Sequence, residues 1–239
     1  MTFRSWPAVV ASLFVAAVAW AMLAPQAPLT IRRPAERPTL ALLTSLPLVF
    51  GESFSLSSGG SPVLTRLEQR YNVLPIGVAD AASLSGQRLL LMAHPRAQPA
   101  EALVDLDRWV RRGGRVLLLA DPRLDWDSAR PFGDRLRPPL GFADTGLLAH
   151  WGLRLEGPAA VGPARAGNGS IEVASVSPGR LSGRGCAIVG DGFVARCRIG
   201  KGAATIIADA DFLNVGAVEG GPGRNLDLLL SELKGLEKR

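Results

Sequence analysis

The chain has 239 residues, of which 47% are hydrophobic. This length suits one domain that can bury a stable core without help from disulfides or metal ions. The formal net charge of +6 comes from arginines scattered along the chain, without a compact basic block or interleaved aromatic residues. This pattern argues against a nucleic-acid partner and indicates a solvated basic surface instead.

The N-terminal segment is the most apolar part of the chain. Residues 5–31 carry no charged side chain, and residues 8–24 are almost entirely apolar. About 20 such residues cross the hydrocarbon core of a bilayer as a helix. We therefore predict a signal anchor with one transmembrane helix over residues 1–24, while cleavage after Ala21 would make the same segment a secretory signal peptide. Both alternatives export the rest, so the expected location is the inner membrane, single-pass, with the globular domain in the periplasm.

A proline-rich segment follows the apolar one. Residues 25–38 contain four prolines and no apolar periodicity, which is typical of an extended stalk. The folded part is expected to begin near Thr39. The predicted organisation is therefore an anchor over residues 1–24, a stalk over residues 25–38 and one extracytoplasmic α/β domain over residues 39–239.

Between residues 40 and 120, short apolar runs alternate with amphipathic stretches. The clearest helix covers residues 99–113, where Leu103, Leu106, Trp109 and Val110 share one face. Continuous apolar runs on both sides of it are typical of buried parallel strands. Such units predict an α/β fold, a three-layer sandwich with a mostly parallel sheet covered by helices on both faces. The elements predicted in this part are strands at 40–43, 73–76, 88–92 and 115–120, and helices at 61–71 and 99–113.

After Pro122 the chain becomes richer in glycine and proline. Asp144 is a candidate N-cap for a short helix over residues 145–151. Strands are predicted at residues 153–155, 170–176 and 203–208, and a closing helix at residues 225–236. This stretch is expected to add a β-hairpin and other short elements to the α/β core.

The only two cysteines, Cys186 and Cys197, flank a predicted β-hairpin. Asp191-Gly192 between them is a favoured two-residue type I′ turn. Counting outward from this turn places Cys186 opposite Cys197, and the Cα atoms of opposed residues, about 4.5 to 5.5 Å apart, are within disulfide range. We predict a disulfide in an oxidising compartment, with two small buried apolar residues as the alternative. A zinc site is not expected, because neither histidine of the chain lies at ligand spacing.

Polar side chains follow the ends of several predicted strands. Ligands of open parallel sheets bind outside the carboxyl ends of the strands, so these side chains are candidates for a ligand-binding crevice. A histidine among carboxylates could also act as acid and base or bind a metal, although Asp and Ser after strands commonly cap the next turn. Nucleophile-elbow, P-loop and dinucleotide motifs are missing, so no catalytic residue, metal or cofactor is assigned. The crevice candidates are Thr44, Ser45, His94, Asp121, Asp209, Asp211 and Asn214.

Several stretches together resemble one protein family. Residues 91–95 (LMAHP) and residues 106–117 (LDRWVRRGGRVL), which run into Asp121-Pro122, are similar to the core of gliding-motility-type ABC transporter auxiliary proteins. The closing part of that family resembles residues 200–202 (GKG), 209–214 (DADFLN) and 225–229 (NLDLL). The resemblance covers roughly residues 39 to 236.

The resemblance implies a flavodoxin-like fold related to class I glutamine amidotransferases, a membrane anchor, and partnership with an ABC permease and ATPase. Catalytic amidotransferases carry a cysteine nucleophile after a central strand, where this chain has His94-Pro95-Arg96, so acyl transfer is not expected. The leading hypothesis is a non-catalytic binding or scaffolding subunit of an ABC-type transport system, with an unidentified small-molecule ligand. The alternatives are a metal-assisted hydrolase that uses the strand-end carboxylates, and a cell-envelope interaction module unrelated to transport.

Overall fold

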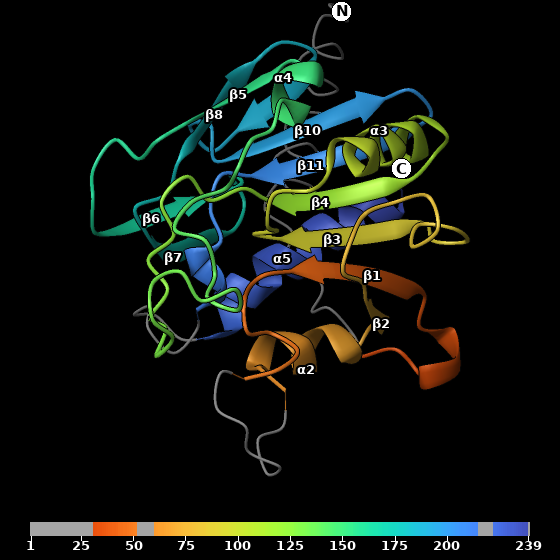
Figure 1. Ribbon diagram of the computed structural model, residues 1–239, viewed down its shortest axis with the longest axis horizontal. Coiled ribbons are helices and arrows are strands. Elements are labelled where there is room, and N and C mark those ends of the chain that lie inside the picture. The colour runs from red at the N-terminus through yellow and green to blue at the C-terminus, as the bar shows by residue number, and fades with distance from the viewer. Residues whose placement is uncertain (1–30, 52–59, 215–221, 239) are drawn as a thin grey trace, which may run out of the picture. The chain divides into compact units, whose positions relative to one another are not determined.

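Seven strands form the central sheet of the computed structural model, which describes residues 31–51, 60–214 and 222–238 (Figure 1). Five neighbouring strands are parallel and two further strands join antiparallel at one edge. The five parallel strands follow the 2-1-3-4-5 order of a doubly wound sheet. In spatial order the strands are β2 (Asn72–Pro75), β1 (Thr39–Thr44), β3 (Leu89–Ala93), β4 (Arg115–Leu119), β11 (Gly202–Ile207), β10 (Val194–Ile199) and β9 (Cys186–Val189).

Helices cover both faces of this sheet. α3 (Ala100–Arg111) lies on the near face in Figure 1, where its Leu106 and Val110 pack with Met92 and Leu118 of the sheet. α5 (Pro222–Glu237) lies behind the sheet and contacts β4, β11 and α2 (Pro62–Glu68). Continuous apolar strands require this double cover, and every residue of β3 and β11 is buried. The prediction of an α/β domain with a mostly parallel sheet is confirmed.

Local sequence signals define where the helices begin and end. The hydroxyl of Ser61 accepts a hydrogen bond from the N–H of Leu64 at 3.1 Å, and Pro62 occupies the first turn of α2. After α3, Gly113 adopts a positive φ of 119°. A Cβ on the next residue, Gly114, would lie 2.3 Å from the Trp109 ring. Because glycine has no side chain, the ring can pack directly against the backbone at the end of α3.

A long insertion separates β4 from β11. It contains α4 (Leu147–His150) and the strands β5 (Leu153–Glu156), β6 (Pro163–Gly167), β7 (Glu172–Val176) and β8 (Arg180–Gly183), followed by β9 and β10. β5 pairs with β8, and β6 pairs with β7, as two small antiparallel sheets. α4 is shorter than predicted because Gly146 has a left-handed φ of 98° and the helix begins only after it. Asp144 still accepts from the N–H of Gly146 at 3.1 Å, so it caps the turn before the helix.

The predicted hairpin and its disulfide are confirmed. β9 and β10 pair in the predicted register, which places Cys186 opposite Cys197. The two cysteines form a disulfide, with their Cα atoms 4.3 Å apart. Asp191 and Gly192 have φ values of 52° and 91°, as a type I′ turn requires.

The first described residues pack against the domain. The Arg32 guanidinium donates to both carboxylate oxygens of Glu237, at 3.3 and 2.5 Å, and the Tyr71 hydroxyl donates to the same carboxylate. A short 3₁₀ helix, η1 (Pro34–Glu36), follows. The second half of the segment predicted as a stalk is thus held to α5 and to the start of β2. The predicted anchor, residues 1–24, lies outside the described residues, and none of the described helices is long and apolar enough to span a bilayer.

Candidate functional site

The carboxyl ends of β1, β3, β4 and β11 lie at one edge of the sheet, as their arrowheads in Figure 1 show. At this edge, one carboxylate oxygen from each of Asp121, Asp209 and Asp211 lies within 4.8 Å of the others. All three residues are buried, with at most 1% of each exposed. We call this group the aspartate cluster.

Backbone amides surround the aspartate cluster. Asp121 Oδ1 accepts from the N–H of Arg123 at 2.8 Å, and its Oδ2 accepts from the N–H of Ala210 at 2.9 Å. The N–H of Asp125 donates to both carboxylate oxygens of Asp211, at 3.1 and 2.9 Å. The carboxylates therefore cap turns, and they join the ends of β4 and β11 to the loop that follows Asp121.

Asp209 is held from two sides. The N–H of Asp211 donates to its Oδ1 at 2.8 Å, and the hydroxyl of Ser175 in β7 donates to its Oδ2. Together with the contacts above, every carboxylate oxygen of the aspartate cluster accepts a hydrogen bond from the protein. The cluster thus ties the insertion to the parallel sheet.

Burial and mutual repulsion raise the pKa of two members of the cluster. Burial, followed by the negative charge of Asp121, raises the pKa of the Asp209 carboxyl well above that of an ordinary aspartate. The same two causes raise the pKa of Asp211 to about 8. A proton on either carboxyl reduces the repulsion that three buried carboxylates would create.

His94 lies at the end of β3 in a left-handed backbone conformation, with a φ of 46°. Its ring is fully buried, and Nε2 lies 2.9 Å from the carbonyl oxygen of Pro139. Since a carbonyl only accepts, Nε2 carries the proton, and Nδ1 has no hydrogen-bond partner among the described residues. Burial lowers the pKa of this imidazole, with a smaller opposing effect from the Pro139 carbonyl, so the ring is neutral at neutral pH. His94 therefore holds the loop that contains Pro139.

The remaining predicted crevice residues contact backbone. The Thr44 hydroxyl donates to the Ala93 carbonyl at 2.9 Å, and the Ser45 hydroxyl donates to the His94 carbonyl, so both join the ends of β1 and β3. Asn214 follows the 3₁₀ helix η2 (Asp211–Leu213), and its N–H donates to the Asp211 carbonyl at 2.8 Å. The structure brings the three aspartates together and places these other residues around strand ends and turns.

Two residues that support the cluster were not predicted as part of it. Ser175, buried in β7, reaches Asp209 from the insertion, where no sequence pattern indicates the contact. The Asn225 side chain donates to the carbonyls of Ala174 and Phe212, both at 2.8 Å, and so joins α5 to β7 and η2. An asparagine in the first turns of a predicted helix was the only available signal for this contact.

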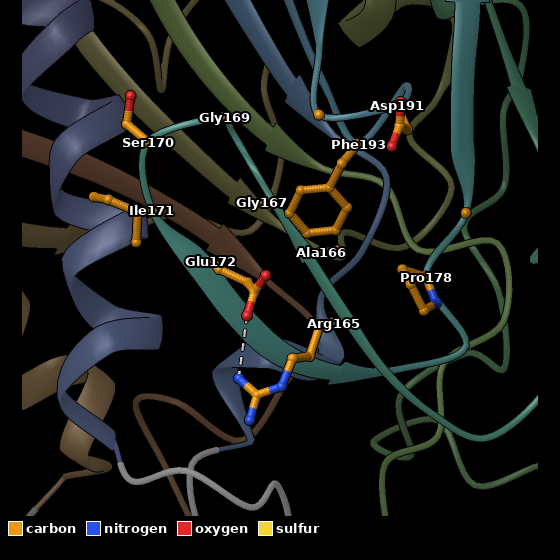
Figure 2. Close-up of a pocket in the computed structure, with 12 residues that line it drawn as sticks. Arg165, Ala166, Gly167, Gly169, Ser170, Ile171, Glu172, Pro178, Asp191 and Phe193 are labelled. Atoms are coloured by element: carbon orange, nitrogen blue, oxygen red, sulfur yellow. Dashed lines mark hydrogen bonds and ion pairs between the residues drawn. The ribbon is translucent and has the colours of Figure 1, made fainter. Parts of the chain in front are cut away.

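A separate cavity of about 400 Å³ lies between the β6–β7 hairpin and the β9–β10 turn (Figure 2). Its volume is within the usual range for small-molecule sites. Arg165 and Glu172 form an ion pair of 3.3 Å at one side, and Asp191 and Phe193 lie at the other. None of the predicted crevice residues lines it, because it is built from the glycine-rich insertion.

The fold and the cluster together define a doubly wound α/β domain whose strand-end carboxylates hold loops. The sequence matches the family of ABC-type uncharacterized transport system proteins over residues 37–180, which is more than half of the chain. The chain belongs to this family. No curated protein matches it significantly.

Solved structures resemble the chain at low identity. A cytoplasmic protein from Salmonella typhimurium is 9% identical with a TM-score of 0.52, over 83% of this chain and 98% of that one, and this likeness concerns the fold alone. An exo-β-1,4-mannosidase from Opitutaceae bacterium strain TAV5 (16% identity, TM-score 0.44) aligns with 74% of this chain. A β-galactosidase from Bacillus circulans sp. alkalophilus (13% identity, TM-score 0.47) aligns with 84% of it. The chain spans only 33% and 31% of these two glycosidases, whose similarity carries no functional argument.

Proposed function

We propose that this protein is a non-catalytic auxiliary subunit of an ABC-type transport system, anchored in the inner membrane with its domain in the periplasm. The observation that carries the proposal is the family match over residues 37–180. The Cys186–Cys197 disulfide supports the exported location, because structural disulfides persist in oxidising compartments. The 2-1-3-4-5 order of the parallel strands supports a flavodoxin-like, amidotransferase-like fold for such a subunit.

The chemistry at the strand ends supports a binding or scaffolding role. Both cysteines of the chain are used in the disulfide, so neither is a free nucleophile. The carboxylates of the aspartate cluster are buried and already hydrogen-bonded to backbone or to Ser175. A general acid or base must reach a substrate proton, and this burial argues against that role.

Purification of the full tagged chain from its native membranes in mild detergent tests the proposal. We expect an ABC permease and an ABC ATPase to co-purify in near-stoichiometric amounts, as identified by mass spectrometry. A single-pass membrane protein of unrelated function, purified in the same way, is the control. Recovery of neither subunit would contradict the proposal, and recovery of other envelope proteins alone would favour the interaction-module alternative.

The convergence of Asp121, Asp209 and Asp211 favours a metal-assisted hydrolase as the second candidate. A divalent cation would compete with protons for Asp211, whose pKa is about 8, so its binding would release protons and strengthen as the pH rises. Titration calorimetry of the full chain with Mn²⁺ or Zn²⁺ in two buffers of different protonation enthalpy measures both effects. Loss of binding in Asp209→Asn, with binding retained in the exposed-site variant Asp127→Asn, would support this candidate.

A further inference from the structure

The loop of residues 128–142, between β4 and α4, exposes three large apolar side chains. Phe132, Leu136 and Leu140 have 77%, 65% and 60% of their surfaces exposed. Single exposed apolar residues are ordinary, whereas three of them in one short loop favour an interaction site. We propose that this loop, called the docking loop below, binds another protein subunit that presents an apolar recess bordered by carboxylates. The inference rests on the proposed function, since that subunit would belong to the same transport system.

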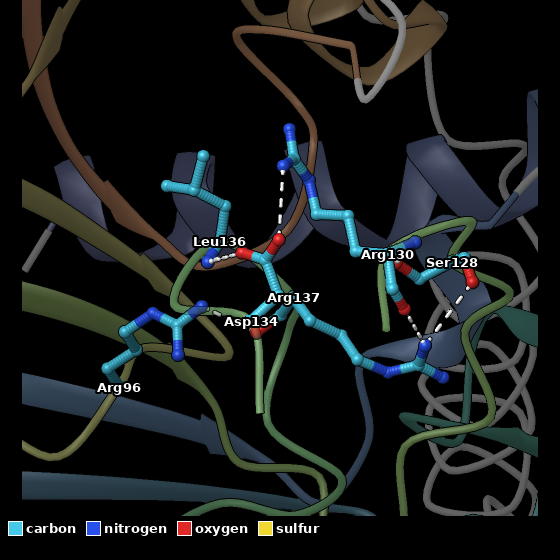
Figure 3. A network of polar contacts seen from close by, with 6 residues as sticks. All are labelled: Arg96, Ser128, Arg130, Asp134, Leu136 and Arg137. Carbon is cyan, nitrogen blue, oxygen red and sulfur yellow. Dashed lines mark hydrogen bonds and ion pairs between the residues drawn. The ribbon is translucent and has the colours of Figure 1, made fainter. Parts of the chain in front are cut away.

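Internal hydrogen bonds fix the backbone of the docking loop (Figure 3). The Arg137 guanidinium donates to the carbonyl oxygens of Ser128 and Arg130, and Arg96 donates to the Arg137 carbonyl at 2.5 Å. Asp134 accepts from the N–H of Leu136 at 2.7 Å. A loop that is already ordered loses little conformational entropy on binding, which favours its use as an interface.

The docking loop is also attached to the buried end of the sheet. His94 Nε2 donates to the Pro139 carbonyl at 2.9 Å, and the N–H of Leu124 donates to the Leu140 carbonyl at 2.9 Å. These bonds set the position of the loop segment that carries Leu140. The buried histidine thus positions the loop.

The composition of the docking loop indicates the chemistry of its partner. Between residues 128 and 142 there are three arginines and one aspartate, and Arg96 lies beside them. The Arg137 guanidinium stacks 4.3 Å from the centre of the Phe132 ring. Aromatic residues and arginine are enriched in protein interfaces, and the excess positive charge complements an acidic rim on the partner.

The position of the docking loop favours a protein partner over a lipid surface. The loop follows the carboxyl end of β4, whereas the chain enters the domain at the opposite edge of the sheet, where Arg32 donates its N–H to the Gln69 carbonyl just before β2. The docking loop and Ile31 therefore lie at opposite edges of the sheet, and a loop remote from the point where the chain enters the domain is available to another protein.

Photo-crosslinking in native membranes tests this assignment on the full chain. Phe132→p-benzoylphenylalanine keeps an aromatic ring at the exposed site, and Val104→p-benzoylphenylalanine on α3, at a residue 56% exposed, is the matched control. We expect an adduct with an ABC permease subunit, which can reach a periplasmic loop, at position 132, roughly tenfold more abundant than at position 104. Adducts with lipid alone, or equal adducts at both positions, would overturn the proposal.

A second experiment, co-purification of variants, distinguishes failure of the docking-loop proposal from failure of the proposed function. The double variant Phe132→Ser, Leu136→Ser is expected to recover the ABC subunits at least about tenfold less well than the wild type, while Val104→Ser recovers them fully. Circular dichroism should show an unchanged fold for each variant, because all three sites are exposed. Full recovery by the double variant would overturn the docking loop alone. Absence of the subunits from the wild type would contradict the proposed function as well.

Discussion

The parallel strands β1, β3, β4 and β11 bury almost every side chain, whereas β5, β6, β8 and β9 of the insertion leave most of theirs at least partly exposed. The first region is stabilised by apolar burial between helices. The second depends on turns, close backbone contacts and one covalent link. At Gly190, for example, a Cβ would lie 1.8 Å from the Gly167 carbonyl oxygen, so only glycine fits. Core substitutions should therefore damage the parallel region most, and backbone or crosslink changes should damage the insertion most.

The largest effect is expected in the parallel region. Leu106 of α3 is fully buried, and Leu106→Ala should lower the free energy of unfolding by about 3 to 4 kcal/mol through lost burial and a residual cavity. Val104→Ala on the exposed side of the same helix should cost less than about 0.5 kcal/mol. Urea unfolding of the full chain in detergent micelles, followed by tryptophan fluorescence, measures both. Equal effects of the two changes would show that this face of α3 is not part of the core.

The aspartate cluster joins the two regions and should make stability depend on pH. The folded-state pKa of Asp211, about 8, is above the ordinary value of 3.8, so proton binding favours the folded state. This contribution is complete below about pH 4 and is lost as the pH rises through about 8. Asp211→Asn should reduce the fall in unfolding free energy between pH 4 and pH 8 by on the order of 3 kcal/mol.

Two comparisons control this measurement. Asp209 also has a raised pKa and remains in the variant, so part of the pH dependence should persist in Asp211→Asn. Asp127→Asn, at an exposed position, should leave the curve of unfolding free energy against pH unchanged. A wild-type protein that becomes more stable as the pH rises from 4 to 8 would contradict the raised pKa values of Asp209 and Asp211.

Removing the disulfide should affect the insertion selectively. The double variant Cys186→Ser, Cys197→Ser should lose about 2 to 3 kcal/mol, because the link closes a short loop in the unfolded chain. Hydrogen exchange should accelerate for amides of β9 and β10 well before those of β3. A reducing agent should produce the same change in the wild type and none in the variant. Uniform acceleration across β3 and β9 would mean that the two regions unfold as one unit.

The same contrast explains which parts of the fold could be predicted. Parallel strands buried on both faces require continuous apolar sequence, and residues 89–93 and 116–120 show it directly. The register of β9 and β10 followed from a single turn, since Asp191-Gly192 fixes the pairing on both sides. In contrast, β6 (PARAG) and β8 (RLSG) have no alternating pattern, because backbone pairing rather than side-chain burial defines them.

At the candidate site, the sequence predicts which residues lie at the strand ends better than it predicts which residues they contact. Asp121, Asp209 and Asp211 follow strands of one parallel sheet, so their shared edge could be deduced, and the structure brings their carboxylates together. Ser175 reaches Asp209 from β7, and this contact depends on how the insertion folds back over the sheet. Whether these strand-end residues bind a ligand remains a prediction.

The smallest expected effect concerns the order of the docking loop. Arg137→Gln removes the guanidinium group that donates to the Ser128 and Arg130 carbonyls. The free energy of unfolding should fall by less than about 1 kcal/mol, because the loop contributes little to the core. Hydrogen exchange at the Leu136 amide should nevertheless accelerate by roughly tenfold, since local opening no longer breaks those bonds. Arg137→Lys keeps the positive charge but not the planar guanidinium, and it should accelerate exchange almost as much. This comparison separates the contribution of guanidinium geometry from that of charge. Unchanged exchange in both variants would show that the Arg137 guanidinium does not order the loop, and the preorganisation that favours docking would then come from the contacts of Asp134, Arg96 and His94.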